Sequence, residues 1–328
     1  MKVKVSELNN QILDVLVKHG YKHEDAVMIR DIVMFGQMSG KLSHGLIRLY
    51  KGSLNVIENQ GEKEIEIMQI TPQSATIRAY QQPGMLIGHI GMNKAIEIAK
   101  SENIGIVTTK GTISTSGCLT YYLEKIALQG LIGIVMSNSE PFVAPFNSTE
   151  PLFGTNPMGF AFPSKEKPLL FDMATSITTF GHVVSAATTG DKLAENIALD
   201  KNGNFTTDTN EALEGSVLPF DNSYKGSGLG MVVEILAGVL SGASFIDLYK
   251  EESWGNIFIV FSPELFMPAE QFKSRMSEFI QRVENARTKD GEKVRLPGVQ
   301  TIANRDKNLQ DDEIEIEDEI LNEFYKYL

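Results

Sequence analysis

A histidine and an arginine lie four positions apart in the segment Ser43-His44-Gly45-Leu46-Ile47-Arg48. If this segment is helical, both side chains project from one face, so a single small anion can contact both. An imidazole transfers protons near neutral pH, and a guanidinium binds a carboxylate through two parallel hydrogen bonds. The pair therefore fits proton transfer beside a bound carboxylate. A helix cap is the alternative role for Ser43, and six residues by themselves do not decide between chemistry and structure.

A second candidate is the segment Tyr224-Lys225-Gly226-Ser227-Gly228-Leu229-Gly230, which precedes the most apolar predicted helix, 229–240. Glycines at a helix start expose backbone N–H groups that suit a phosphate, and Lys225 adds positive charge. The same glycines would also let a buried helix pack closely, and the sequence leaves both interpretations open. Met231 stands where a third glycine of Gly-x-Gly-x-x-Gly would be, so the standard Rossmann motif is absent.

Composition argues against several classes of protein. The chain has 328 residues and a formal net charge of -12, which disfavours nucleic acids and anionic membranes as partners. No run of about 18 apolar residues predicts a membrane span, and no signal-peptide pattern opens the chain. Because Cys118 is the single cysteine, no intrachain disulfide can form, and a cytoplasmic location is expected. No Cys/His cluster has metal-site spacing, so no metal is predicted.

The hydrophobic pattern predicts the elements that must position these residues. Its period changes near residue 64, from helical spacing to the alternation that is typical of strands. The predicted helices are 6–19, 24–38, a third that carries the histidine and arginine and ends near residue 54, 92–100, 121–129, 229–240 and 269–284. The predicted strands are 64–67, 75–78, 104–108, 131–136 and 256–261. The polar segment 190–222 is expected to be a surface excursion, and the end from residue 311 is expected to be helical.

Four motifs occur together in a characteristic order. They are Ser43-His44-Gly45-x-x-Arg48, Gly154-Thr155-Asn156-Pro157, Asp172-Met173-Ala174-Thr175-Ser176 and Lys225-Gly226-x-Gly228-Leu229. Each is weak alone, but the ordered set, over about residues 5–300, resembles the malate/L-lactate dehydrogenase family of the non-Rossmann type. That family includes ureidoglycolate and sulfolactate dehydrogenases, 2,3-diketogulonate reductase and piperideine-2-carboxylate reductase.

The resemblance implies an α+β fold in which a mixed-sheet cofactor domain, not a Rossmann domain, is combined with a helical domain. We expect the helical domain at residues 1–74, joined by a C-terminal helix at 307–328. The NAD(P)-binding domain is expected at residues 75–306. The resemblance also implies a homodimer whose active sites use both subunits.

The resemblance further implies NAD or NADP as cofactor and a small carboxylate as substrate, a 2-oxo or 2-hydroxy acid. His44 is then the proton donor or acceptor, Ser43 supports it, and Arg48 holds the substrate carboxylate. Thr155 and Asn156 are expected to line the same cleft. The residues expected at the cofactor are Ser139, Asp172, Met173, Ala174, Thr175, Ser176, Tyr224, Lys225, Gly226 and Gly298.

Three positions depart from the family pattern. Many members have Asn-His-Phe-Gly where this chain has Ser114-Thr115-Ser116-Gly117, without a histidine. Leu42 replaces a frequent aspartate, and Val299 replaces a frequent acidic residue after Gly298. A threonine is no acid near neutral pH, so either His44 transfers the proton alone or the substrate is an uncommon one. Reduction of a cyclic imine carboxylate at the same site, and cofactor binding without catalysis, are the alternatives.

Overall fold

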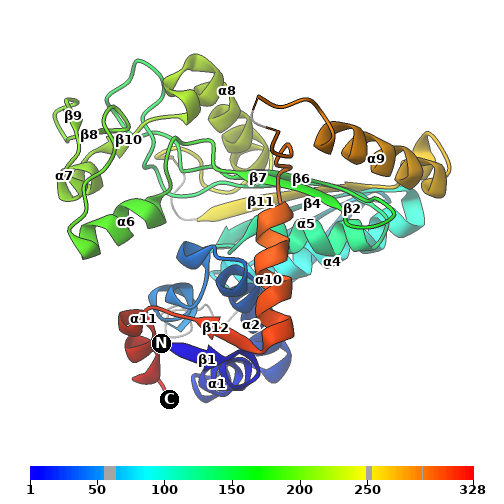
Figure 1. The fold of residues 1–328 in the computed structure, drawn as a ribbon, viewed down its shortest axis with the longest axis horizontal. Coiled ribbons are helices and arrows are strands. Elements are labelled where there is room, and N and C mark those ends of the chain that lie inside the picture. Colours follow the sequence, from blue (N-terminus) through cyan, green and yellow to red (C-terminus); the bar gives the residue numbers. More distant parts are fainter. Residues whose placement is uncertain (55–63, 249–252, 290) are drawn as a thin grey trace.

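A seven-stranded mixed sheet lies at the centre of the computed structural model, which describes residues 1–54, 64–248, 253–289 and 291–328 (Figure 1). The strand order is β2-β3-β4-β11-β5-β6-β7. The strands are β2 (Glu66–Thr71), β3 (Ser74–Arg78), β4 (Ile104–Thr112), β5 (Ile132–Ser137), β6 (Met158–Phe162), β7 (Leu169–Met173) and β11 (Trp254–Phe261). β3 and β4 pair in parallel, whereas the other neighbours pair antiparallel. The expected α+β class with a mixed sheet is confirmed.

Both faces of the sheet are covered, because successive side chains of a strand point to opposite faces. On β11, Phe258 and Val260 join the main core with α4 (Gly84–Glu102) and α5 (Leu119–Leu128). The alternate residue Ile257 packs on the other face against α8 (Tyr224–Val233) and its π-helical continuation η4 (Glu234–Val239). The parallel pair β3–β4 is connected by α4, as a parallel crossover requires.

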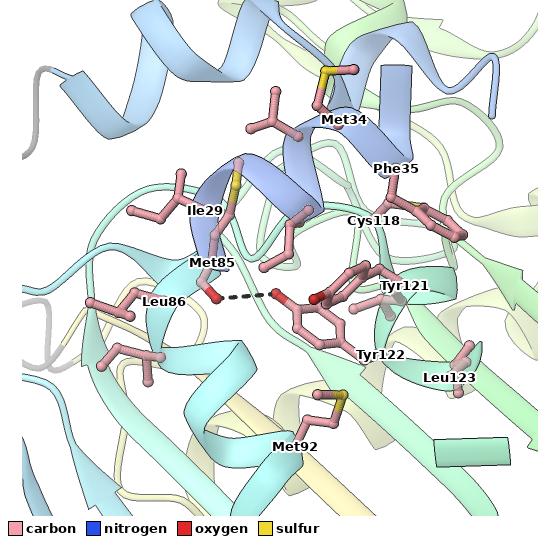
Figure 2. Close-up of a cluster of buried hydrophobic side chains, with 14 of the residues drawn as sticks. Ile29, Met34, Phe35, Met85, Leu86, Met92, Cys118, Tyr121, Tyr122 and Leu123 are labelled. Atoms are coloured by element: carbon pink, nitrogen blue, oxygen red, sulfur yellow. Dashed lines mark hydrogen bonds between the residues drawn. The ribbon is translucent and has the colours of Figure 1, made fainter. Parts of the chain in front are cut away.

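The main core joins the sheet to the N-terminal helices α1 (Val5–Lys18) and α2 (His23–Met38). Figure 2 shows Ile29 and Phe35 of α2 packed against Met85 of α4 and the two tyrosines of α5. Tyr122 is fully buried, and its hydroxyl lies within hydrogen-bond distance of two carbonyl oxygens, those of Ser116 (2.5 Å) and Met85 (3.5 Å), with the shorter contact to Ser116. The core therefore also fixes the position of the loop that contains Ser116.

The two ends of the chain lie side by side (Figure 1). Strand β1 (Lys2–Lys4) pairs antiparallel with β12 (Glu313–Glu315). Along the chain, β12 lies between α10 (Val299–Asp311) and α11 (Asp318–Tyr325). The expected continuous helix at 307–328 is therefore wrong, because β12 interrupts it. Strand β2 belongs to the sheet although we placed its residues in the helical domain. The division into two domains otherwise stays a prediction.

Most helices with a strong apolar period are confirmed within a few residues. The predictions 6–19, 24–38 and 121–129 correspond to α1, α2 and α5, and 269–284 corresponds to α9 (Ala269–Glu284). The helix predicted at 92–100 begins earlier, at Gly84. The glycines in its first part are helix positions that pack closely against neighbouring segments. A Cβ on Gly88 would lie 2.5 Å from the Tyr122 hydroxyl, so glycine lets α4 approach α5.

The third predicted helix ends near residue 54 as expected, but it begins only after the turn at Gly45 and so does not carry His44. Leu42–His44 forms one turn of 3-10 helix (η1), Gly45 breaks the chain direction with φ -93° and ψ -143°, and a π-helical segment (η2, Leu49–Ser53) follows. His44 and Arg48 therefore do not lie on one regular helix. Their proximity comes from the turn at Gly45, where a Cβ would lie 2.2 Å from the Gln37 side-chain oxygen.

The segment 190–222 is not a loose excursion. With α6 (Phe180–Thr189) it forms a side lobe of residues 180–217, containing α7 (Thr209–Glu214) and a three-stranded sheet. The strands of that sheet are β8 (Ala198–Leu199), β9 (Phe205–Thr206) and β10 (Ser216–Val217). Val183, Ala212 and Val217 are fully buried in its own small core. These few apolar residues are far apart in sequence, so no local period reveals them.

Candidate active site

A cavity of about 670 Å³ lies where η1, the loop before α5, the ends of β5 and β7 and the start of α6 meet. Ser43, His44 and Arg48 all border it. The segment 43–48, which was predicted to do chemistry from its residue types, thus faces a cavity large enough for small molecules. The turn at Gly45, rather than helical spacing, brings the histidine and arginine to the same wall.

His44 is held neutral in this wall. Its Nδ1 lies 3.0 Å from Ser43 Oγ. Burial lowers its pKa to about 4, the positive charges of Arg48 and Lys41 act in the same direction, and Asp172 opposes them. A neutral imidazole at neutral pH can accept a proton, and it becomes a stronger acid once protonated. Ser43 lies inside η1, where its hydroxyl contacts the imidazole and caps neither η1 nor η2.

Arg48 is a partly buried cation. Its Nε donates to the backbone oxygen of Ser43 (2.7 Å), which ties it to the histidine turn. Burial alone lowers its pKa, and among the described residues no carboxylate forms an ion pair with it. A buried charge without a counter-ion is costly unless a ligand supplies one. Arg48 therefore favours an anion in the cavity.

A second cation in the same wall, Lys41, was missed by the sequence reasoning. Its Nζ donates to Asp172 Oδ1 (2.5 Å) and Thr120 Oγ1 (3.0 Å), and Thr120 N donates to the other carboxylate oxygen (3.0 Å). Burial raises the pKa of Asp172, but Lys41 and the Thr120 hydroxyl together outweigh burial, and the net pKa is lowered. Asp172, expected at the cofactor, thus neutralises Lys41. The sequence signal for this second cation was the lysine two positions before Ser43.

The loop that lacks the family histidine is built from hydroxyl groups. Thr115 Oγ1 accepts from the backbone N–H of Gly117 (3.0 Å), and Ser116 Oγ donates to Asn256 Oδ1 (2.8 Å). Ser114 has φ +67°, and its buried Oγ has no hydrogen-bond partner in the described structure. All four residues 114–117 border the cavity. This wall can bind a polar ligand but offers no second proton donor near neutral pH.

The residues expected to bind substrate or cofactor divide into two groups. Ser139, Thr155, Asp172, Met173 and Ala174 border the cavity. Asn156, Thr175, Ser176, Tyr224, Lys225, Gly226 and Gly298 do not border it.

The second group has packing contacts of its own. The buried Asn156 Nδ2 donates to Gly230 O (3.0 Å) and Glu234 Oε1 (2.8 Å). A Cβ on Gly226 would lie 2.0 Å from Phe220 O, and one on Gly298 would lie 2.4 Å from a backbone oxygen of β7. These contacts favour the packing interpretation of the glycines. Cofactor roles for this group stay a prediction.

Three aromatic side chains that the sequence did not single out also border the cavity: Phe142, Phe180 and Trp254. The rings of Phe142 and Phe180 meet edge to face, with centroids 4.9 Å apart and planes at 90°. Phe180 is the first residue of α6, and the Thr179 side chain caps this helix by accepting from the backbone N–H of His182. The side lobe, through Phe180, therefore contributes to an apolar part of the lining.

The family model described as malate/L-lactate dehydrogenase matches residues 3–324. The chain belongs to this family. The resemblance drawn from four motifs is confirmed, and so is the enzyme class, an oxidoreductase that depends on a pyridine nucleotide. Within the described residues, no helix is long and apolar enough to cross a membrane, and no three acidic, His or Cys side chains cluster as metal ligands.

Relatives and solved structures resemble the chain over nearly its whole length. The L-sulfolactate dehydrogenase of Methanocaldococcus jannaschii is 33% identical, and the match covers 98% of this chain and 95% of that protein. The crystal structure of malate dehydrogenase from Entamoeba histolytica superposes with a TM-score of 0.92 at 26% identity, covering 100% and 97% of the two chains. The Delta(1)-pyrroline-2-carboxylate reductase of Pseudomonas fluorescens is 32% identical over 77% of this chain and 78% of that protein.

Proposed function

We propose that the chain interconverts a small 2-oxo acid and the corresponding 2-hydroxy acid with NAD(H) or NADP(H). The observation that carries the proposal is the wall formed by His44 and Arg48: a neutral imidazole beside a partly buried cation that has no counter-ion among the described residues. The names of the relatives, malate and sulfolactate dehydrogenase, support a 2-hydroxy acid substrate.

The cavity fits the nicotinamide half of such a cofactor. The partnerless buried hydroxyl of Ser114, with Ser139 and Thr155 nearby on the lining, suits a ligand rich in hydroxyl and amide groups. Met173 and Ala174 would border the same ligand. When bound, the reduced nicotinamide supplies the hydride, so that the 2-oxo carbon is reduced and NAD(P)H becomes NAD(P)+.

The chain's own residues then orient the acid and move its proton. Arg48 pairs with the substrate carboxylate and fixes the position of the carbonyl group. The paired anion offsets the positive charge that helps to lower the pKa of His44, so the imidazole becomes easier to protonate. His44 donates its proton to the forming alkoxide oxygen and, in the reverse direction, accepts the hydroxyl proton. Ser43 Oγ holds the other ring nitrogen in place.

The test is a panel of 2-oxo acids with NADH and with NADPH, followed by the absorbance of the reduced cofactor. We expect His44→Ala to lower kcat by about 100-fold or more, since general acid–base catalysis contributes factors of that order. The affinity for the cofactor should be kept. The exposed His23 provides the matched control, His23→Ala, which should leave kcat unchanged. Cofactor binding without turnover of any acid would contradict the proposal and favour a non-catalytic member.

A cyclic imine carboxylate reductase is the second candidate. It is favoured by the similarity to the Delta(1)-pyrroline-2-carboxylate reductase and by the threonine in place of the family histidine. A protonated imine already carries the proton that a carbonyl must receive. This version predicts turnover of cyclic imine carboxylates, little turnover of 2-oxo acids, and a smaller effect of His44→Ala.

We further propose that the chain forms a homodimer with shared active sites. Support comes from an exposed apolar face on α8 and the helical segment that follows it, formed by Tyr224, Met231, Val232, Ile235, Val239 and Leu240. Exposed apolar surface of this kind marks interaction sites. Ile235→Glu should give a monomer in light scattering and should lose turnover. The control Leu128→Glu, at another exposed leucine, should stay dimeric and active. A monomeric wild type would refute this assignment.

A further inference from the structure

Among the described residues, the charges on the cavity lining already balance before any ligand binds. Arg48 and Lys41 are the cations, and Asp172 and Glu140 are the anions. Lys41 is committed to Asp172 through a 2.5 Å hydrogen bond. His44 is neutral at pH 7, because its pKa is lowered to about 4. One cation, Arg48, is thus left for one anionic group of a substrate.

Glu140 disfavours a second anionic group. It follows the end of β5, its side chain is exposed, and it has no ion-pair partner among the described residues that border the cavity. A second carboxylate or sulfonate would find no further free cation among the described lining residues, would share the cavity with the negative charge of Glu140, or would have to displace Asp172 from Lys41. Both cost free energy, because like charges repel and a buried ion pair is expensive to break.

The apolar wall lies next to Arg48. Gly181, the second residue of α6, approaches the arginine so closely that a Cβ there would lie 3.3 Å from Nη2 and 2.8 Å from the Cβ of Ser43. The preceding residue, Phe180, is 44% exposed and rests edge to face on the buried Phe142. An acid whose carboxylate pairs with Arg48 therefore has an aromatic surface within reach of its other end.

We propose that the substrate is a 2-oxo acid with a single anionic group and an apolar side chain, and that Phe180 contacts this side chain. The inference rests on the proposed reaction and sharpens its substrate class. It separates this chain from the relatives named for malate and sulfolactate. Malate and sulfolactate each carry two anionic groups. Apolar contact removes both the aromatic ring and the substrate side chain from water, which favours binding in proportion to the area buried.

The experiment compares kcat/KM of the wild type for 4-methyl-2-oxopentanoate, phenylpyruvate, pyruvate and oxaloacetate, with each cofactor. We expect an apolar acid to exceed oxaloacetate by about tenfold or more, the range in which apolar pockets discriminate. Phe180→Ala should lower kcat/KM for the apolar acids about tenfold more than for pyruvate. Phe180→Leu should keep most of the preference, since it retains apolar contact. Glu140→Gln should raise kcat/KM for oxaloacetate.

The matched control is Phe205→Ala, which removes an exposed aromatic residue of the same lobe that does not border the cavity. It should leave all four values unchanged. Reduction of oxaloacetate in preference to the apolar acids, or an equal effect of Phe180→Ala on all acids, would overturn the inference and leave the proposed reaction standing. No reduction of any acid would refute the reaction itself and the inference with it.

Discussion

His44 should make the stability of this protein depend on pH in a direction that follows from its surroundings. Burial, then Arg48 and Lys41, lower its pKa from the ordinary 6.5 to about 4. Between these two values the unfolded chain binds a proton that the folded chain does not. The free energy of unfolding therefore falls as the pH falls. The stabilisation is complete above about pH 6.5 and is lost by about pH 4.

The size of this effect follows from the difference between the two pKa values. One pKa unit corresponds to about 1.4 kcal/mol, so the change from 6.5 to about 4 amounts to ~3.5 kcal/mol at most. The imidazole is only partly shielded from solvent at the cavity wall, so the expected change in the free energy of unfolding lies below that limit.

The perturbation is His44→Gln, which keeps a hydrogen-bonding side chain of similar size but cannot titrate. Urea denaturation of both proteins, from about pH 7 to about pH 4, gives the difference in their free energies of unfolding. The carboxylates titrate in both proteins and largely cancel in this difference. Wild type should lose ~2–3 kcal/mol more than the variant. His23→Gln, at an exposed position, should follow the wild type. Parallel curves for wild type and His44→Gln would refute the reasoning.

Three further predictions concern buried groups. Lys41→Met leaves the Asp172 carboxylate buried without its cation, so urea denaturation should show a loss of about 3 kcal/mol, and the double variant Lys41→Met/Asp172→Leu should regain part of it. Glu234→Gln turns an acceptor oxygen into a donor facing N–H groups, which should cost about 1–3 kcal/mol; an unchanged denaturation midpoint would contradict this. Gly226→Ala should lower Tm with or without cofactor, because its Cβ would meet Phe220 O, whereas a loss seen only with cofactor would restore the phosphate-binding interpretation.

Local patterns predicted the elements that have a strong period of their own. The amphipathic helix at 269–284 and the strands of the central sheet required only the spacing of apolar residues. The side lobe was missed because its core is assembled from single residues such as Val183, Ala212 and Val217, which show no period together. The turn at Gly45 was missed because a helix and a sharp turn can present the same two side chains to one cavity.

The sequence by itself determined the family and the enzyme class, because ordered motifs are carried by local residue types, and it predicted roles for the histidine and the arginine. Only the tertiary structure decided which charges are free. Lys41 and Asp172 are 131 positions apart and neutralise each other, while Arg48 keeps its charge available beside the cavity. Phe180 likewise reaches that cavity from a lobe that has no family motif. Charge pairing and apolar contact act across space between distant segments, so residue spacing alone could not show them.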